Sequence, residues 1–188
     1  MTVPGTFDTS ARELIHAGLQ NLDEARSLFR QLSASGFDAA RCGLLLDALQ
    51  HVCDPDVALR NLVDIVNAQV SQGRALDDIM PDDTAFRQLV AVLGVSDAMG
   101  KLMRFRPDLV QAAATDHCNS HLYNHDQRRA HVLESVGADP NDRMSPTATM
   151  DLADAATALR RTYRNQLAAI IAQDTMSDDP IALQPRIS

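Results

Sequence analysis

Along most of the chain, apolar residues recur every three or four positions and are separated by polar ones. This spacing places them on one face of an amphipathic helix, and no stretch of useful length alternates as a half-buried strand would. The sequence therefore predicts an all-α fold, a bundle of about seven or eight helices joined by short turns. The last of them is one long C-terminal helix, roughly from Thr149 to Asp174.

Capping residues divide this pattern into separate helices. Ser10 followed by Glu13 is a capping box that opens a short first helix. Asp54-Pro55 places an N-cap before a proline at the first helical position. Glycine is the usual residue at helix ends because it takes the left-handed conformation without steric cost. The expected helix ends are Gly18, Gly36, Gly73, Gly94 and Gly137.

The stretch VLGVSDAMGKLMRFRPDLV, which begins at Val92, contains glycines and a Gly-Lys pair, as a phosphate-binding loop does. That loop has four residues between its glycines and a Ser or Thr after its lysine. Here Gly94 and Gly100 are separated by five residues, and Leu102 follows Lys101. We therefore interpret the stretch as a tight corner between two helices, in which Gly94 is left-handed and Gly100 allows close packing.

The long helix carries an apolar stripe, and the segment after it has no evident core. The sequence therefore divides into a helical domain over residues 1–174 and a tail over residues 175–188. Ile181, Leu183 and Ile187 of the tail have nothing evident to pack on, as if a further element were missing. We expect the stripe to be partly exposed where that element would dock. The stripe residues are Met150, Ala153, Ala156, Leu159, Tyr163, Leu167, Ile170 and Ile171.

Composition restricts the class of protein. A net charge of −8 and a pI near 5.0 argue against nucleic-acid binding, which needs a basic footprint. No apolar run approaches the ~20 residues of a membrane span, and no signal peptide opens the sequence, so we expect a cytoplasmic protein without membrane contact. Among the cysteines, we expect Cys42 and Cys53 to be small buried hydrophobes.

Two groups of residues resemble metal sites. In a helix, His117, His121 and His125 would share one face, a spacing that can chelate zinc, but an exposed polar linker explains the same residues. Asp54 and Asp56 resemble a magnesium-binding pair, but their context at a helix start favours an N-cap with an acidic first turn.

Arg160, Arg161 and Arg164 form a basic patch on the long helix of an acidic chain. A solvated helical face explains them, and so does contact with an acidic neighbour, either another domain or an anionic ligand, since guanidinium suits paired recognition. They are our candidate interface residues. The sequence offers no residue that we assign to catalysis, to a cofactor or to a metal.

Two segments together, and a third that is more specific, resemble one known family. AFRQLVAVLG with the following corner, up to Val110, is similar to a Leu-Gly-x-Ser, helix, x-Pro-x-Leu motif. ALRRTYRNQLAAIIAQD, from Ala158 to Asp174, is similar to a Leu-Arg, aromatic-Arg, Ile-x-x-x-Asp helix. GFDAARCGLLLDALQHVCDPDVALRNLVDI resembles the actinobacterial members in particular. These motifs belong to the glutamine-synthetase adenylyltransferase/adenylyl-removing enzymes, and the order and spacing agree from about Leu22 onward.

The resemblance implies that this chain is the N-terminal helical part of a large nucleotidyltransferase of nitrogen metabolism. One half of such enzymes attaches AMP from ATP to a tyrosine of glutamine synthetase, and the other half removes it by phosphorolysis. Both halves hold Mg²⁺ with an Asp-x-Asp pair after a glycine-serine loop, and no residue here matches that motif. The resemblance therefore implies a chain that is inactive alone, with Mg and ATP bound elsewhere in the full-length enzyme. The implied partners are the rest of that chain, glutamine synthetase and the PII signalling protein.

Two other classes of function fit the same residues. One is a free-standing helical adaptor that binds protein partners without an attached enzyme, and the other is a zinc-binding helical domain. The gene sequence beyond codon 188 separates the enzyme from the adaptor, and elemental analysis tests for zinc.

Overall fold

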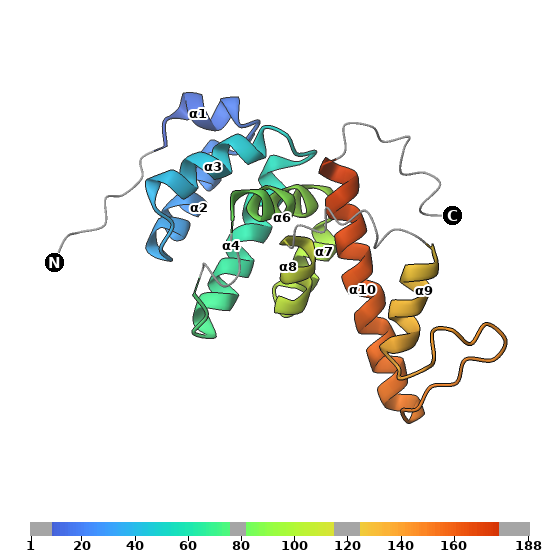
Figure 1. Ribbon diagram of the computed structural model, residues 1–188. Helices are drawn as coiled ribbons and strands as arrows, with labels where there is room; N and C mark the ends of the chain where they lie inside the picture. The colour runs from blue at the N-terminus through green and yellow to red at the C-terminus, as the bar shows by residue number, and fades with distance from the viewer. Residues whose placement is uncertain (1–8, 76–81, 115–124, 177–188) are drawn as a thin grey trace.

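The computed structural model describes residues 9–75, 82–114 and 125–176. The described residues form helices and connecting turns with no strand, which confirms the predicted all-α class with its one long last helix (Figure 1). The helices are α1 (Ala11–His16), α2 (Leu22–Ala34), α3 (Ala39–Leu49), α4 (Pro55–Ser71), α6 (Asp83–Val95), α7 (Asp97–Met103), α8 (Pro107–Ala114), α9 (His125–Glu134) and α10 (Leu152–Met176).

Most of the predicted capping residues begin or end these helices. The Ser10 backbone N–H donates to Glu13 Oε2 at 2.8 Å, which completes the capping box of α1. Asp54 caps α4 by accepting the Val57 N–H at 3.0 Å, with Pro55 as the first helical residue. Four of the five glycines expected at helix ends have positive φ, as the C-terminal turn requires. They are Gly18, Gly36, Gly73 and Gly137.

Gly94 is the exception, and the prediction of a left-handed residue there is wrong. It lies inside α6, which continues to Val95. A Cβ atom on Gly94 would lie 2.8 Å from the Cβ atom of Val52, so the glycine is needed for close approach to the turn after α3. Gly100 has the predicted packing role, because its Cβ atom would lie 2.4 Å from Cγ of Asn61 on α4.

One continuous core joins helices α1 to α8 with the C-terminal half of α10, and we call this part the body. Helix α6 is central because it packs against α3, α4, α8 and α10. Its side chains Leu89 and Leu93 are fully buried. Cys42 is buried in this core as predicted, whereas Cys53 is exposed because it lies in the turn before the Asp54 cap.

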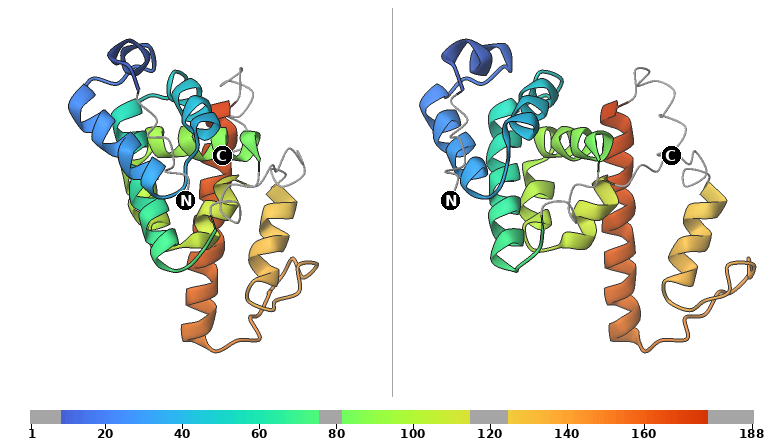
Figure 2. Two further views of the ribbon diagram at one scale, coloured as in Figure 1. Left: turned by 90° about the vertical axis from the view of Figure 1, so that its left-hand side faces the viewer. Right: turned by 60° about the vertical axis from the view of Figure 1, so that its left-hand side comes forward.

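The second part, which we call the arm, consists of α9, residues 135–151 and the N-terminal half of α10. It projects from the body in every view (Figures 1 and 2). Its buried cluster holds only Val136, Ala138 and Ala155, with Leu133 and Ala158 beside them. The arm therefore has much less apolar packing than the body.

Polar contacts to backbone carbonyls close the arm. The two terminal nitrogens of Arg129 donate to the Pro140 carbonyl at 2.8 Å and to the Asp142 carbonyl at 2.7 Å. Gln166 of α10 donates to the Arg128 carbonyl of α9 at 3.4 Å. These bonds join α9, the following loop and α10.

The predicted apolar stripe of the long helix is only partly right. Met150 precedes the helix, and Leu159 and Tyr163 are 40% and 64% exposed. The helix instead turns small residues inward, which lets α6 and α8 approach closely. The expected partial exposure of the stripe is confirmed. The buried residues of α10 are Ala155, Thr162, Ala168 and Ala172.

Helix α10 ends at Met176, close to the predicted domain boundary at residue 174, and residues 177–188 of the predicted tail lie outside the described residues. No helix in the described part of the chain has the length and apolar character that crossing a bilayer demands.

Candidate functional site

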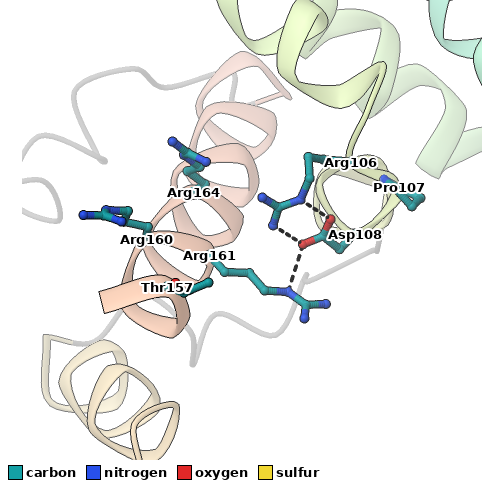
Figure 3. Close-up of a pocket in the computed structure, with 7 residues that line it drawn as sticks. All are labelled: Arg106, Pro107, Asp108, Thr157, Arg160, Arg161 and Arg164. Atoms are coloured by element: carbon teal, nitrogen blue, oxygen red, sulfur yellow. Dashed lines mark hydrogen bonds and ion pairs between the residues drawn. The ribbon is translucent and has the colours of Figure 1, made fainter. Parts of the chain in front are cut away.

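A hollow of about 610 Å³ lies between the start of α8 and the middle of α10, where the body meets the arm (Figure 3). It contains all three arginines that the sequence proposed as interface candidates, and it adds Arg106. Its lining residues are Arg106, Pro107, Asp108, Thr157, Arg160, Arg161 and Arg164.

Asp108 organises one side of the hollow. Arg106 donates from Nε and Nη2 to its two carboxylate oxygens at 2.9 and 2.8 Å, and Arg161 donates from Nε at 3.0 Å (Figure 3). The Asp108 side chain is only 17% exposed. The hydrogen bonds and positive charge of Arg106, followed by those of Arg161, lower the pKa of Asp108 to about 2. The carboxylate thus stays ionised at neutral pH and holds both guanidinium groups in place.

The Arg-Pro-Asp sequence explains this local arrangement. Pro107 is the first residue of α8, where its missing N–H and fixed φ are favourable. Asp108 therefore falls in the first turn, where a negative charge interacts well with the helix dipole. The hydrogen bonds to Asp108 raise the pKa of Arg106, so this pair is ionised under all ordinary conditions.

Arg160 and Arg164 differ from the other two arginines. Within residues 9–75, 82–114 and 125–176, neither has an ion-pair partner. Four guanidinium groups with one carboxylate leave the hollow with a net charge of +3, although the whole chain carries −8. The site can therefore accept negative charge.

The remaining polar side chain of the hollow gives no further donor. Thr157 Oγ1 already donates its proton to the Ala153 carbonyl at 2.9 Å. An anion in the hollow would therefore be held by guanidinium groups, which is an arrangement suited to carboxylate or phosphate oxygens.

An exposed apolar strip runs along α10 beside the hollow. Leu152, Leu159 and Tyr163 follow one another at helical spacing, and each is exposed. Arg160 lies three residues before Tyr163 on the helix, so the two are surface neighbours and Arg160 lies at the edge of this strip. The surface thus combines apolar side chains with positive charge, which is typical of protein interfaces.

The residues that resembled metal ligands do not form a site in the described part of the chain. His117 and His121 lie outside the described residues, and His125 is an exposed residue at the start of α9. No group of three potential metal ligands occurs among the residues that the structure describes.

Asp54 is the N-cap of α4 and Asp56 lies in its acidic first turn, as predicted. Asp56 accepts the backbone N–H groups of Gln20 and Asn21, at 3.0 and 3.3 Å, and so joins the start of α4 to the turn before α2. This second contact could not be predicted from the sequence, because it connects residues that are far apart in the chain.

Sequence reasoning found Arg160, Arg161 and Arg164 but missed Arg106 and Asp108 as members of the same site. The Arg-Pro-Asp start of α8 could have marked a fixed ion pair. Its position against α10 depends on tertiary packing, so the chain pattern alone could not reveal it.

The amino-acid sequence of the chain is similar to known proteins of one family. The chain is 62% identical to a bifunctional glutamine synthetase adenylyltransferase/adenylyl-removing enzyme of Bifidobacterium longum (strain DJO10A), over 97% of this chain and 17% of the relative. It is 33% identical to the enzyme of that name from Corynebacterium efficiens, over 72% of this chain and 15% of the relative. A Leifsonia xyli relative is 28% identical over 90% of this chain. No family model and no solved structure matches.

These identities confirm the resemblance drawn from the quoted segments. The chain spans about one sixth of the length of the curated relatives it matches. It belongs to the family of bifunctional glutamine synthetase adenylyltransferase/adenylyl-removing enzymes.

Proposed function

We propose that this chain is an N-terminal, non-catalytic helical part of such an enzyme, and that its α10 surface contacts the rest of a longer polypeptide. The observation that carries the proposal is the exposed apolar strip of α10 beside a basic hollow in an acidic chain. Apolar surface of this kind is normally covered in the working protein.

The proposal of a non-catalytic role is supported by what two acidic residues near α4 already do. Asp54 and Asp56 form an Asp-x-Asp sequence, but both carboxylates accept backbone N–H groups at helix starts. A magnesium pair needs carboxylates that are free to face a metal ion. We therefore assign ATP and Mg²⁺ to other parts of the full-length enzyme.

The proposed partners follow the relatives' printed name and the family resemblance. In the cytoplasm, the rest of the polypeptide would cover α10, while glutamine synthetase is the substrate of the whole enzyme and PII its regulator. Arg160, Arg161 and Arg164 are the proposed contacts to an acidic neighbour, with Arg161 also fixed to Asp108.

The experiment is an assay of AMP attachment and AMP removal by the full-length enzyme with Leu159→Gln and Tyr163→Gln together. Both side chains are exposed here, so the isolated chain should keep its melting temperature. We expect the rate of AMP removal to fall about tenfold or more, since tyrosine is enriched among interface hot spots, where truncation costs about 2 kcal/mol or more.

The control is Ile15→Gln on α1, which removes an apolar side chain of similar exposure far from the hollow along the chain. It should leave both rates unchanged. Normal rates for the α10 variant, with the same stability as the unaltered enzyme, would rule out this surface as a contact that matters for activity.

A further inference from the structure

We propose that the hollow between α8 and α10 binds a small phosphate-bearing anion through Arg106, Arg160 and Arg164. The starting observation is the excess of positive charge, since four guanidinium groups line the hollow and Asp108 is its one carboxylate. Arg160 and Arg164 also belong to the proposed contact of α10 with other protein segments, but the anion site needs only residues of this chain and is tested on this chain alone.

The free arginines are unfavourable to the fold when nothing is bound. Arg160 and Arg164 are four residues apart on α10, where like charges destabilise a helix. Neither has an ion-pair partner in the described ranges to offset this effect. A bound dianion would remove the repulsion and add hydrogen bonds.

The side of the hollow around Asp108 is already organised for binding. Arg106 uses Nε and Nη2 on Asp108, and Arg161 uses Nε, so each guanidinium keeps N–H groups for another acceptor (Figure 3). Asp108 has fixed these two side chains before a ligand arrives. Less side-chain freedom is then lost on binding.

The chemistry favours phosphate over other anions. A phosphate group offers several oxygens in a tetrahedral arrangement and carries nearly two negative charges, whereas a carboxylate offers two oxygens and one charge. The acidic remainder of the chain disfavours nucleic acids. A hollow of about 610 Å³ is the size of a small-molecule site, so a phosphorylated metabolite fits better than a polymer.

The test is a titration of the 188-residue chain with inorganic phosphate and with pyrophosphate, followed by NMR of backbone and arginine Nε resonances at constant ionic strength. We expect saturable shifts at Arg106, Arg160 and Arg164, with a Kd of about 1 mM or tighter for pyrophosphate. Glutamate, as the carboxylate comparator, should bind at least about tenfold more weakly.

Two double variants test whether Arg160 and Arg164 bind the anion. Arg160→Gln with Arg164→Gln should weaken pyrophosphate binding about tenfold or more, whereas Arg160→Lys with Arg164→Lys keeps the charge and should weaken it less. The matched control, Arg12→Gln with Arg143→Gln, removes two exposed arginines elsewhere and should change binding less than about twofold.

Three results would overturn the inference. They are no saturable shift at the hollow up to about 20 mM pyrophosphate, equal binding of glutamate, and equal weakening by the control pair. Because the titration uses this chain alone, failure here leaves the contact between α10 and a longer polypeptide untouched, and failure of that contact leaves the titration unaffected.

Discussion

The body and the arm share helix α10 but are stabilised in different ways. In the body, α6 packs against several other helices, among them α3, α4, α8 and α10, and buries Leu89 and Leu93 completely. In the arm, three small side chains form the buried cluster, and Arg129 closes the loop through two carbonyl groups. The body is therefore built on apolar burial and the arm on a few directional hydrogen bonds.

This difference affects which side chains of α10 are exposed and available for contacts. The arm half of α10 leaves Leu159 and Tyr163 exposed because no helix of the body covers that side. The arginine hollow lies where the two parts meet, with Asp108 of the body bound to Arg161 of the arm half of α10. On α10, exposed apolar and basic side chains thus lie in the arm half of the helix and at its junction with the body.

The substitution with the greatest expected cost in stability lies in the body. Leu89→Ala removes a fully buried side chain at the centre of α6 and should lower the free energy of unfolding by about 3 kcal/mol. Val136→Ala in the arm should cost about 1 kcal/mol and act locally, because its cluster is small. Urea unfolding measures the first change, and hydrogen exchange of α9 amides measures the second.

An equal loss of global stability in Val136→Ala and Leu89→Ala would contradict this difference between the arm and the body. That result would mean that the arm and the body unfold as one unit with a shared core. Faster exchange confined to α9 and the adjoining loop would support two parts of unequal stability.

A second stability prediction concerns the close packing of α7 against α4 in the body. In Gly100→Ala the new Cβ atom would crowd Cβ and Cγ of Asn61, and overpacking should outweigh the better helix propensity of alanine and cost about 2 kcal/mol. Gly43→Ala is the matched control, since no atom lies within 4 Å of its new Cβ atom. The control should stabilise the chain by about 0.5–1 kcal/mol.

Both glycine variants can be compared by thermal unfolding under the same conditions. Equal stabilisation by Gly100→Ala and Gly43→Ala would show that α4 and α7 are less closely packed than the structure indicates.

The smallest effect concerns the link between body and arm. Asp108→Asn removes the charge that joins Arg106 to Arg161 and should cost about 1 kcal/mol at pH 7. Because the folded pKa of Asp108 is lowered to about 2, its stabilising effect is complete above the ordinary aspartate pKa. It is lost as the pH falls through about 4 to about 2.

The measurement is urea unfolding of both proteins across this pH range, where the gap between them should close on acidification. A gap that stays constant with pH would assign the loss to packing, not to the charge of Asp108.

The sequence predicted the features that depend on local chemistry. Helix starts at Ser10 and Asp54 and the end at Gly137 follow from capping, which acts over a few residues. The prediction for Gly94 and part of the predicted α10 stripe were wrong for one shared reason, whereas Leu167 and Ile171 of the stripe do pack against the core. The conformation of Gly94 depends on the close approach of Val52, and the buried face of α10 depends on how α8 packs against it.

For the same reason, only part of the candidate site could be predicted from the sequence. Arg160, Arg161 and Arg164 are close in the sequence, so their clustering on one helix could be foreseen. Asp108 lies more than fifty positions away, and its contact with Arg161 depends on how α8 packs against α10. Its role could not be inferred from helical spacing.

Cysteine labelling tests most directly whether the α10 surface is a contact for the rest of a longer polypeptide. In a Cys53→Ser, Cys118→Ser background, Tyr163→Cys and Ile15→Cys place thiols at positions that are 64% and 62% exposed here. We expect the thiol at position 163 to react about tenfold or more slowly in the full-length enzyme than in this chain, and the thiol at position 15 to react equally in both. Equal reaction of position 163 in the two proteins would contradict the account.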